Sequence, residues 1–153
     1  MKNHLTRTTL AVAVAAAIAG CGGSSSSLTG GGASYEAVGA VADGYLVGAT
    51  VCLDLNENNE CDTDEPSATS GENGVFTIST STQADLDASI VVEVSSTTID
   101  EDTGAAVGAA YTLTAPAGSA FVSPITTLVK HFADSNPAFT DEEVQTIVRA
   151  RLA

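Results

Sequence analysis

The sequence is poor in basic residues and contains no tryptophan. Its 153 residues include 19 Asp and Glu but only five Lys and Arg, so the formal net charge is -14. Such a surface repels phosphate groups, and we exclude nucleic acid as a partner. Aromatic residues make up only 5% of the chain, so few rings are available to stack on bases or sugars. The length fits one domain with a short appendage.

The chain also lacks an apolar run long enough to cross a bilayer. Residues 10–19 are apolar throughout, but a spanning helix needs about 20 such residues. Lys2 and Arg7 precede this run, and a basic start followed by a short apolar stretch is typical of a secretory signal peptide. We therefore predict that residues 1–20 are a signal peptide.

A cysteine follows this segment directly. The sequence Ile18-Ala19-Gly20-Cys21 resembles the lipobox of bacterial lipoproteins, in which the cysteine is diacylated and becomes the new N-terminus. The resemblance implies a lipid anchor at Cys21 that holds the protein to a membrane of the cell envelope. Gly22, rather than Asp, comes next and favours the outer membrane, with its periplasmic or surface face left open. The alternative is an ordinary secretory signal that happens to be followed by cysteine.

The remaining cysteines fit an exported protein. Lipidation of Cys21 would leave one pair, Cys52 and Cys61, in an oxidising compartment where a disulfide persists. We therefore predict that this pair is bridged. The alternative, part of a metal site, lacks a CxxC motif and a nearby histidine.

Residues 21–34 and 35–122 differ sharply in composition. After Cys21 the first segment is nearly all Gly and Ser, which predicts a flexible tether.

In residues 35–122, short apolar runs alternate with turn signals such as Asp43-Gly44 and Asn73-Gly74. The segments predicted as strands are 36–42, 45–53, 67–70, 75–78, 90–94, 111–114 and 121–122. No helix-length crossover separates them, so we expect a mainly β fold, a small Ig-like antiparallel sandwich.

The hydrophobic period changes at residue 123. Ser123-Pro124 is an N-cap followed by proline at the first helical position. The apolar residues then recur at helical spacing; they are Ile125, Leu128, Val129 and Phe132. Asn136-Pro137 ends this helix, and Thr140 and Glu143 have the spacing of a capping box for a second one. We predict a two-helix hairpin over residues 123–153, and because it lacks a C-cap signal we expect the natural chain to continue.

One segment carries the pattern of a metal site. Residues 54–65 match the calcium-loop pattern D-x-[DN]-x-[DN]-G-x5-E at every ligand position. The predicted Ca²⁺ ligands are Asp54, Asn56, Asn58, Glu60 through its main-chain carbonyl, Asp62 and Glu65. Asn59 replaces the usual glycine, and we expect it to be tolerated because Asn enters the left-handed region more readily than most residues. The alternative is a solvated acidic turn.

The surroundings of this loop differ from those of an EF-hand. Pro66 directly follows Glu65 and disfavours helical backbone there, and the residues before Asp54 have strand character. We therefore expect a calcium loop set between strands. A bond between Cys52 and Cys61 would close the same loop that the metal closes.

Several stretches carry a family resemblance. Residues 43–54, the loop with Glu65-Pro66, and 74–78 resemble serine-aspartate-repeat B-type and carboxypeptidase-regulatory-like domains, which are transthyretin-like β-sandwiches of bacterial surface proteins. Residues 98–104 and 123–129 are similar to segments that follow this domain in surface lipoproteins of Gram-negative bacteria. The resemblance implies a structural, stalk or adhesive module without catalysis, and a surface protein or glycan as its ligand.

Catalytic patterns have simpler explanations in this sequence. His131 is the only histidine after residue 20, Ser123 is explained as an N-cap, and no G-x-S-x-G motif occurs. The acidic run 100–102 is most simply a solvated loop. We therefore expect a lipid-anchored, calcium-stabilised, non-catalytic binding or structural module at the cell surface. The alternative is an accessory domain of a larger secreted enzyme whose catalytic part lies beyond residue 153.

Overall fold

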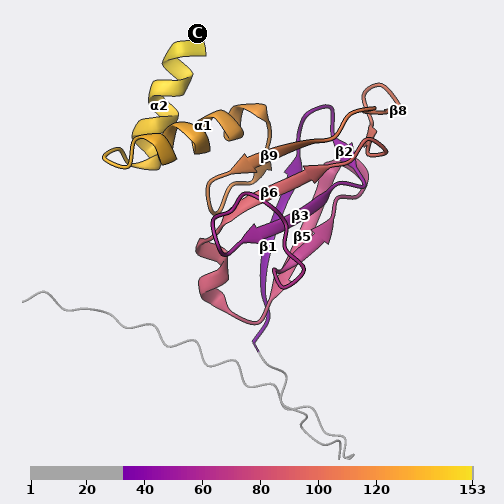
Figure 1. Cartoon of the computed structure of the whole chain (residues 1–153), viewed down its shortest axis with the longest axis horizontal. Coiled ribbons are helices and arrows are strands. Elements are labelled where there is room, and N and C mark those ends of the chain that lie inside the picture. Colours follow the sequence, from indigo (N-terminus) through magenta and orange to yellow (C-terminus); the bar gives the residue numbers. More distant parts are fainter. Residues whose placement is uncertain (1–32, 153) are drawn as a thin grey trace, which may run out of the picture. The chain divides into compact units, whose positions relative to one another are not determined.

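The structure is a computed structural model that describes residues 33–152 (Figure 1). The predicted signal peptide, the predicted lipidation site Cys21 and most of the predicted tether lie outside the described residues. Among residues 33–152, no helix has both the length and the apolar character needed to cross a membrane.

The described residues form mainly strands, followed by two α-helices. The strands are β1 (Tyr35–Val41), β2 (Leu46–Val47), β3 (Thr50–Asp54), β4 (Ser67–Thr69), β5 (Val75–Thr80), β6 (Ser89–Val94), β7 (Ile99–Asp100), β8 (Ala105–Ala106), β9 (Tyr111–Ala115) and β10 (Phe121–Val122). The helices are the 3-10 turns η1 (Glu72–Gly74) and η2 (Gln83–Asp87) and the α-helices α1 (Pro124–Ser135) and α2 (Asp141–Leu152). The strands form three sheets with the orders β10-β1-β5, β4-β3-β6-β9 and β2-β7-β8.

The two larger sheets share one hydrophobic core. Side chains alternate along β5, so that Phe76 and Ile78 are buried while their neighbours are exposed, as a strand with one face toward a core requires. Val51 and Val92, from the four-stranded sheet, belong to the same buried cluster. The prediction of a small, mainly β sandwich followed by a helical hairpin is confirmed.

The pairing of the strands differs from the prediction in two places. The strand predicted over residues 45–53 is divided into β2 and β3, which lie in different sheets, because Gly48 between them has a φ of +85°. Only a residue without Cβ takes up that angle at little cost. The sandwich is also not wholly antiparallel, since β10 pairs in parallel with the end of β1. The short pair β7 and β8 was not predicted, because two-residue strands leave no periodic pattern.

The two α-helices begin at the residues that the sequence predicts. A capping box closes the start of α1, with Ser123 accepting from the Thr126 backbone N–H at 3.2 Å and Thr126 Oγ1 accepting from the Ser123 N–H at 2.8 Å. At α2 the carboxylate of Glu143 accepts the N–H and the hydroxyl of Thr140, and these bonds lower the pKa of Glu143.

The helices bury their apolar residues mainly against each other. Val129 of α1 packs with Val144 and Val148 of α2 in a cluster separate from the sandwich core. The predicted apolar face of α1 is only partly covered, because Ile125 and Leu128 remain exposed. Instead, α1 joins the sandwich through polar contacts: the hydroxyls of Thr126 and Thr127 both donate to the carbonyl of Thr114 in β9.

Candidate metal loop

The acidic loop 54–65 connects two strands that pair with each other. It leaves β3 at Asp54 and leads to β4, and Cys52 lies opposite Ser67 in the antiparallel register of these strands. The Leu53 N–H donates to the Pro66 carbonyl at 3.0 Å across the base of the loop. The expected setting between strands, in place of the helices of an EF-hand, is therefore what the backbone shows.

The backbone of the loop passes twice through the left-handed region. Asn59, which replaces the usual glycine, has a φ of +61°, as expected. Glu57 has the same positive φ, which nothing in the sequence predicted. The two left-handed residues turn the chain tightly enough for side chains from both halves of the loop to meet inside it.

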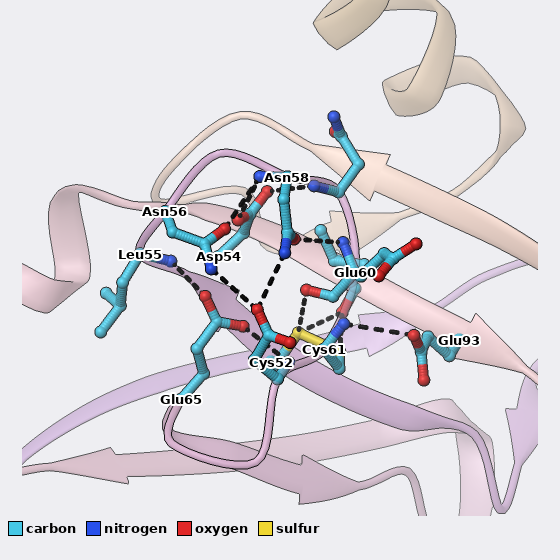
Figure 2. Close-up of a disulfide and its surroundings, with 12 residues drawn as sticks. Cys52, Asp54, Leu55, Asn56, Asn58, Glu60, Cys61, Glu65 and Glu93 are labelled. Carbon is cyan, nitrogen blue, oxygen red and sulfur yellow. Dashed lines mark hydrogen bonds between the residues drawn. A yellow bond between two sulfur atoms is a disulfide. The ribbon is translucent and has the colours of Figure 1, made fainter.

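A disulfide ties the middle of the loop to the strand that precedes it (Figure 2). Cys52 and Cys61 are bridged, with their Cα atoms 5.6 Å apart, which confirms the predicted pair. Cys52 is fully buried and Cys61 is half-buried. Beside the bridge, the carboxylate of Glu93 in β6 accepts the Cys61 N–H at 3.2 Å. The sequence did not predict this contact, because it depends on the register between β3 and β6.

The first and last residues of the loop are buried carboxylates. Asp54 is only 1% exposed and accepts the backbone N–H groups of Asn58 and Asn59, each at 3.0 Å. Glu65 is 8% exposed and accepts the N–H of Leu55 at 2.7 Å and that of Asp62 at 3.1 Å. Each carboxylate therefore closes a turn of the loop through main-chain donors.

The side chains between these ends also converge (Figure 2). The amide groups of Asn56 and Asn58 both donate to Oδ2 of Asp62, at 2.7 and 2.8 Å. Their Oδ1 atoms accept the N–H groups of Asn58 and Glu60. Five of the six predicted ligands thus meet through their side chains in one network with the loop backbone. The sixth, the Glu60 carbonyl, lies 3.9 Å from Sγ of Cys52, against the disulfide.

The negative charge of this network has no basic side chain to balance it. Within residues 33–152 the single ion pair joins Lys130 and Asp134, at 2.7 Å. Lys130 and Asp54 both line a cavity of about 890 Å³ between the loop, η2 and α1, yet the Lys130 ammonium is bonded to Asp134. Asp85 and Glu57 add further carboxylates to the cavity wall.

The loop offers enough oxygen ligands for a hard cation only if amide oxygens take part as well as carboxylates. In the described part of the chain, no three His, Cys, Asp or Glu side chains are grouped closely enough to hold a metal by themselves. Oδ1 of Asn56 and Oδ1 of Asn58 each accept one hydrogen bond, which leaves a second lone pair on each oxygen. The residues that could supply oxygen ligands are the carboxylates of Asp54, Asp62 and Glu65 and these two amides, and a cation would have to draw the three carboxylates closer together.

Other predicted features lie away from the loop. His131 is exposed on α1, and the Ser123 hydroxyl is engaged as the cap of that helix. The acidic run 100–102 ends β7 and begins the turn to β8, where Asp100 accepts the Asp102 N–H at 2.9 Å. No protein-family model, no curated protein and no solved structure matches this chain.

Proposed function

We propose that this chain is a lipid-anchored, non-catalytic surface module whose β-sandwich is stabilised by calcium bound in the loop 54–65. One observation carries the proposal. Asp54 and Glu65 are nearly fully buried at the two ends of the same loop, and both receive only backbone N–H donors. Hydrogen bonds satisfy the oxygens but leave two negative charges in a poorly solvated place, where a counter-charge is strongly favoured.

The oxygen ligands that the loop offers favour calcium. It takes six to eight oxygen ligands in flexible geometry, whereas magnesium demands a compact octahedron and keeps several waters. Asp54, Asp62 and Glu65 supply three negative charges, and the amides of Asn56 and Asn58 supply neutral oxygens. A cation held by these groups would link both ends of the loop and so hold β3 and β4 together.

Calorimetric titration of the full chain in detergent with CaCl₂ tests this proposal. We expect one site with a dissociation constant of about 10⁻⁴–10⁻³ M, the range of extracellular modules. Glu65→Gln should weaken binding at least about tenfold, because it removes one ligand charge. Glu57→Gln is the matched control: it removes the same charge from an exposed position that is not a predicted ligand, and it should bind as the wild type does. Wild-type protein that takes up no calcium, or equal loss in both variants, would contradict the proposal.

The anchor is tested separately, at Cys21. Cys21→Ser should move the protein from the membrane fraction to the soluble fraction and abolish labelling with a fatty acid. Gly30→Ser, within the predicted tether, is the control and should leave both unchanged. Wild-type protein that partitions into the aqueous phase of a detergent extraction would show that residue 21 carries no lipid.

A structural or binding role also agrees with the rest of the described chain. Ser123 acts as a helix cap, and His131 is exposed without a hydrogen-bond partner that would orient it as a base. The expected partner is a protein or glycan at the cell surface. Calcium would serve such a module by making its loop rigid, not by chemistry.

A further inference from the structure

We infer that the Cys52–Cys61 disulfide is a redox control on the calcium loop, so that the loop binds calcium more tightly when the bridge is closed than when it is open. The inference rests on the proposed function. Its observations are the position of the bridge within the loop and the different burial of its two cysteines.

The bridge holds the part of the loop where the amide side chains of the network converge on one carboxylate. Cys61 directly precedes Asp62, whose Oδ2 accepts both Asn56 and Asn58. Cys52 lies in the centre of β3, fully buried and two residues before Asp54. The disulfide therefore fixes Asp62 relative to the strand that presents Asp54. Without it, the contacts of Cys61 with the sheet are the bond from its N–H to Glu93 and the approach of its Sγ to the Val91 carbonyl oxygen at 3.8 Å.

Closing the bridge should raise calcium affinity by reducing the entropy cost of binding. A cation must hold Asp54, Asp62 and Glu65 around one point, and an open loop would have to be ordered during binding. With the bridge closed, part of that ordering has already taken place as the protein folds, because Asp62 is held beside the strand that carries Asp54. The open loop must lose this chain entropy when calcium binds, whereas the bridged loop has lost part of it already. If about half of the entropy that a disulfide removes from a loop of this length is involved, calcium binds about tenfold more tightly to the bridged form.

The bridge can be opened from the side of Cys61. Cys61 is partly exposed, whereas Cys52 has no exposed surface, so a thiolate of an external dithiol attacks Sγ of Cys61 and Cys52 leaves as a thiolate. The second thiol of the dithiol then displaces Cys61 and forms the reductant's own disulfide. Two electrons and two protons pass to the protein, which gains two thiols.

Reciprocity provides a test that needs no substitution in the bridge. If the closed bridge strengthens calcium binding about tenfold, calcium must shift the thiol–disulfide equilibrium toward the closed form by the same factor. The full wild-type chain is equilibrated with mixtures of reduced and oxidised dithiothreitol, at saturating calcium and with chelator. Alkylation and mass spectrometry then give the fraction of Cys52 and Cys61 that is bridged.

We expect calcium to raise the equilibrium constant for closure about tenfold in the wild type and in Glu57→Gln, and much less in Glu65→Gln at the same calcium concentration, because that variant binds calcium more weakly. Calorimetric titration of the double variant Cys52→Ser/Cys61→Ser should show calcium binding about tenfold weaker than in the bridged protein. If the double variant does not fold, the wild-type equilibrium decides the question alone.

The outcomes separate this inference from the proposed function. Calcium binding to the bridged protein without any shift in the thiol–disulfide equilibrium would overturn the redox control and leave the calcium site standing. An equal shift in Glu65→Gln would also overturn it, because calcium would then act outside the loop. If the bridged protein takes up no calcium, the proposed function fails and the inference fails with it.

Discussion

Leu55 and Glu65, ten positions apart, close the acidic loop by a hydrogen bond of 2.7 Å from the Leu55 N–H to Oε1 of Glu65. The other oxygen of the same carboxylate accepts the Asp62 N–H at 3.1 Å. Glu65 is thus a hydrogen-bond acceptor for the loop backbone as well as a predicted calcium ligand. A substitution at this position changes two properties, which must be measured separately.

Glu65→Gln should destabilise the protein even without calcium. Charge repulsion alone would predict no loss or a small gain, because the substitution deletes one of several crowded negative charges. Glutamine, however, keeps one acceptor and turns an NH₂ group toward the second backbone donor, so one of the two part-buried N–H groups loses its partner. We expect a loss of about 1 kcal/mol in the free energy of unfolding, measured by urea denaturation in chelator.

The exposed Glu57 again provides the control for that measurement. Glu57→Gln should stay within about 0.5 kcal/mol of the wild type. Equal stability of Glu65→Gln and wild type in chelator would show that the two backbone bonds to Glu65 contribute nothing to the fold.

Tyr111 should give the protein a pH-dependent stability in the alkaline range. Burial, the hydrogen bond from the Tyr111 hydroxyl to Asp43 at 2.9 Å, and the charges of Asp43 and Asp100 raise the pKa of Tyr111 to about 12. The folded state therefore holds this proton more tightly than the unfolded state, whose tyrosine pKa is about 10. The stabilisation is complete below pH 10 and is lost as the pH rises from about 10 to 12.

Spectrophotometric titration checks the raised pKa of Tyr111. The chain contains three tyrosines, so a variant without Tyr111 is needed to assign its ionisation. The wild type should show an ionisation near pH 12 that is missing in Tyr111→Phe. Asp43→Asn should move that ionisation to lower pH, since it removes a negative charge near the phenol. Titration of Tyr111 near pH 10 in the folded protein would contradict the hydrogen bond.

Gly74 should tolerate no side chain. Its φ is +66°, and a Cβ built on it would lie 2.3 Å from the carbonyl oxygen of Val41. Gly104 has a φ of +67° with nothing within 4 Å of a built Cβ, so it isolates the backbone contribution. We expect Gly104→Ala to cost about 1 kcal/mol and Gly74→Ala about 3 kcal/mol or more, both by urea denaturation. Similar losses in the two variants would mean that β1 does not approach the turn at Gly74 so closely.

Local patterns in the sequence predicted most of the fold. The Ser123-Pro124 start of α1 and the Thr140 to Glu143 spacing are cap motifs whose hydrogen bonds form within four residues, so they can be read without knowing the tertiary structure. Most of the longer strands follow from apolar runs and turn residues in the same way, but the division at Gly48 and the two-residue strands β7 and β8 do not. The parallel pairing of β10 with β1 could not be predicted, because it joins residues about 80 positions apart through backbone groups that every sequence contains.

The sequence indicates which residues form the candidate metal loop but not the contacts that support it. The spacing of Asp54, Asn56 and Asn58 and the pairing of the cysteines are properties of a continuous segment. The contact of Cys61 with Glu93 depends on sheet register, and the positive φ of Glu57 depends on how the loop closes. Neither leaves a pattern in a single sequence.

The stabilisation of the fold by calcium is the central claim, and scanning calorimetry of the full chain in detergent tests it most directly. At a calcium concentration ten times the dissociation constant, binding adds about 1.4 kcal/mol of stability, which should raise the melting temperature by about 5 °C over the value in chelator. Magnesium should have a smaller effect, and Glu65→Gln should lose most of the calcium effect. Identical melting temperatures of the wild type in millimolar calcium and in chelator would contradict the claim and reduce the loop to a disulfide-closed acidic turn.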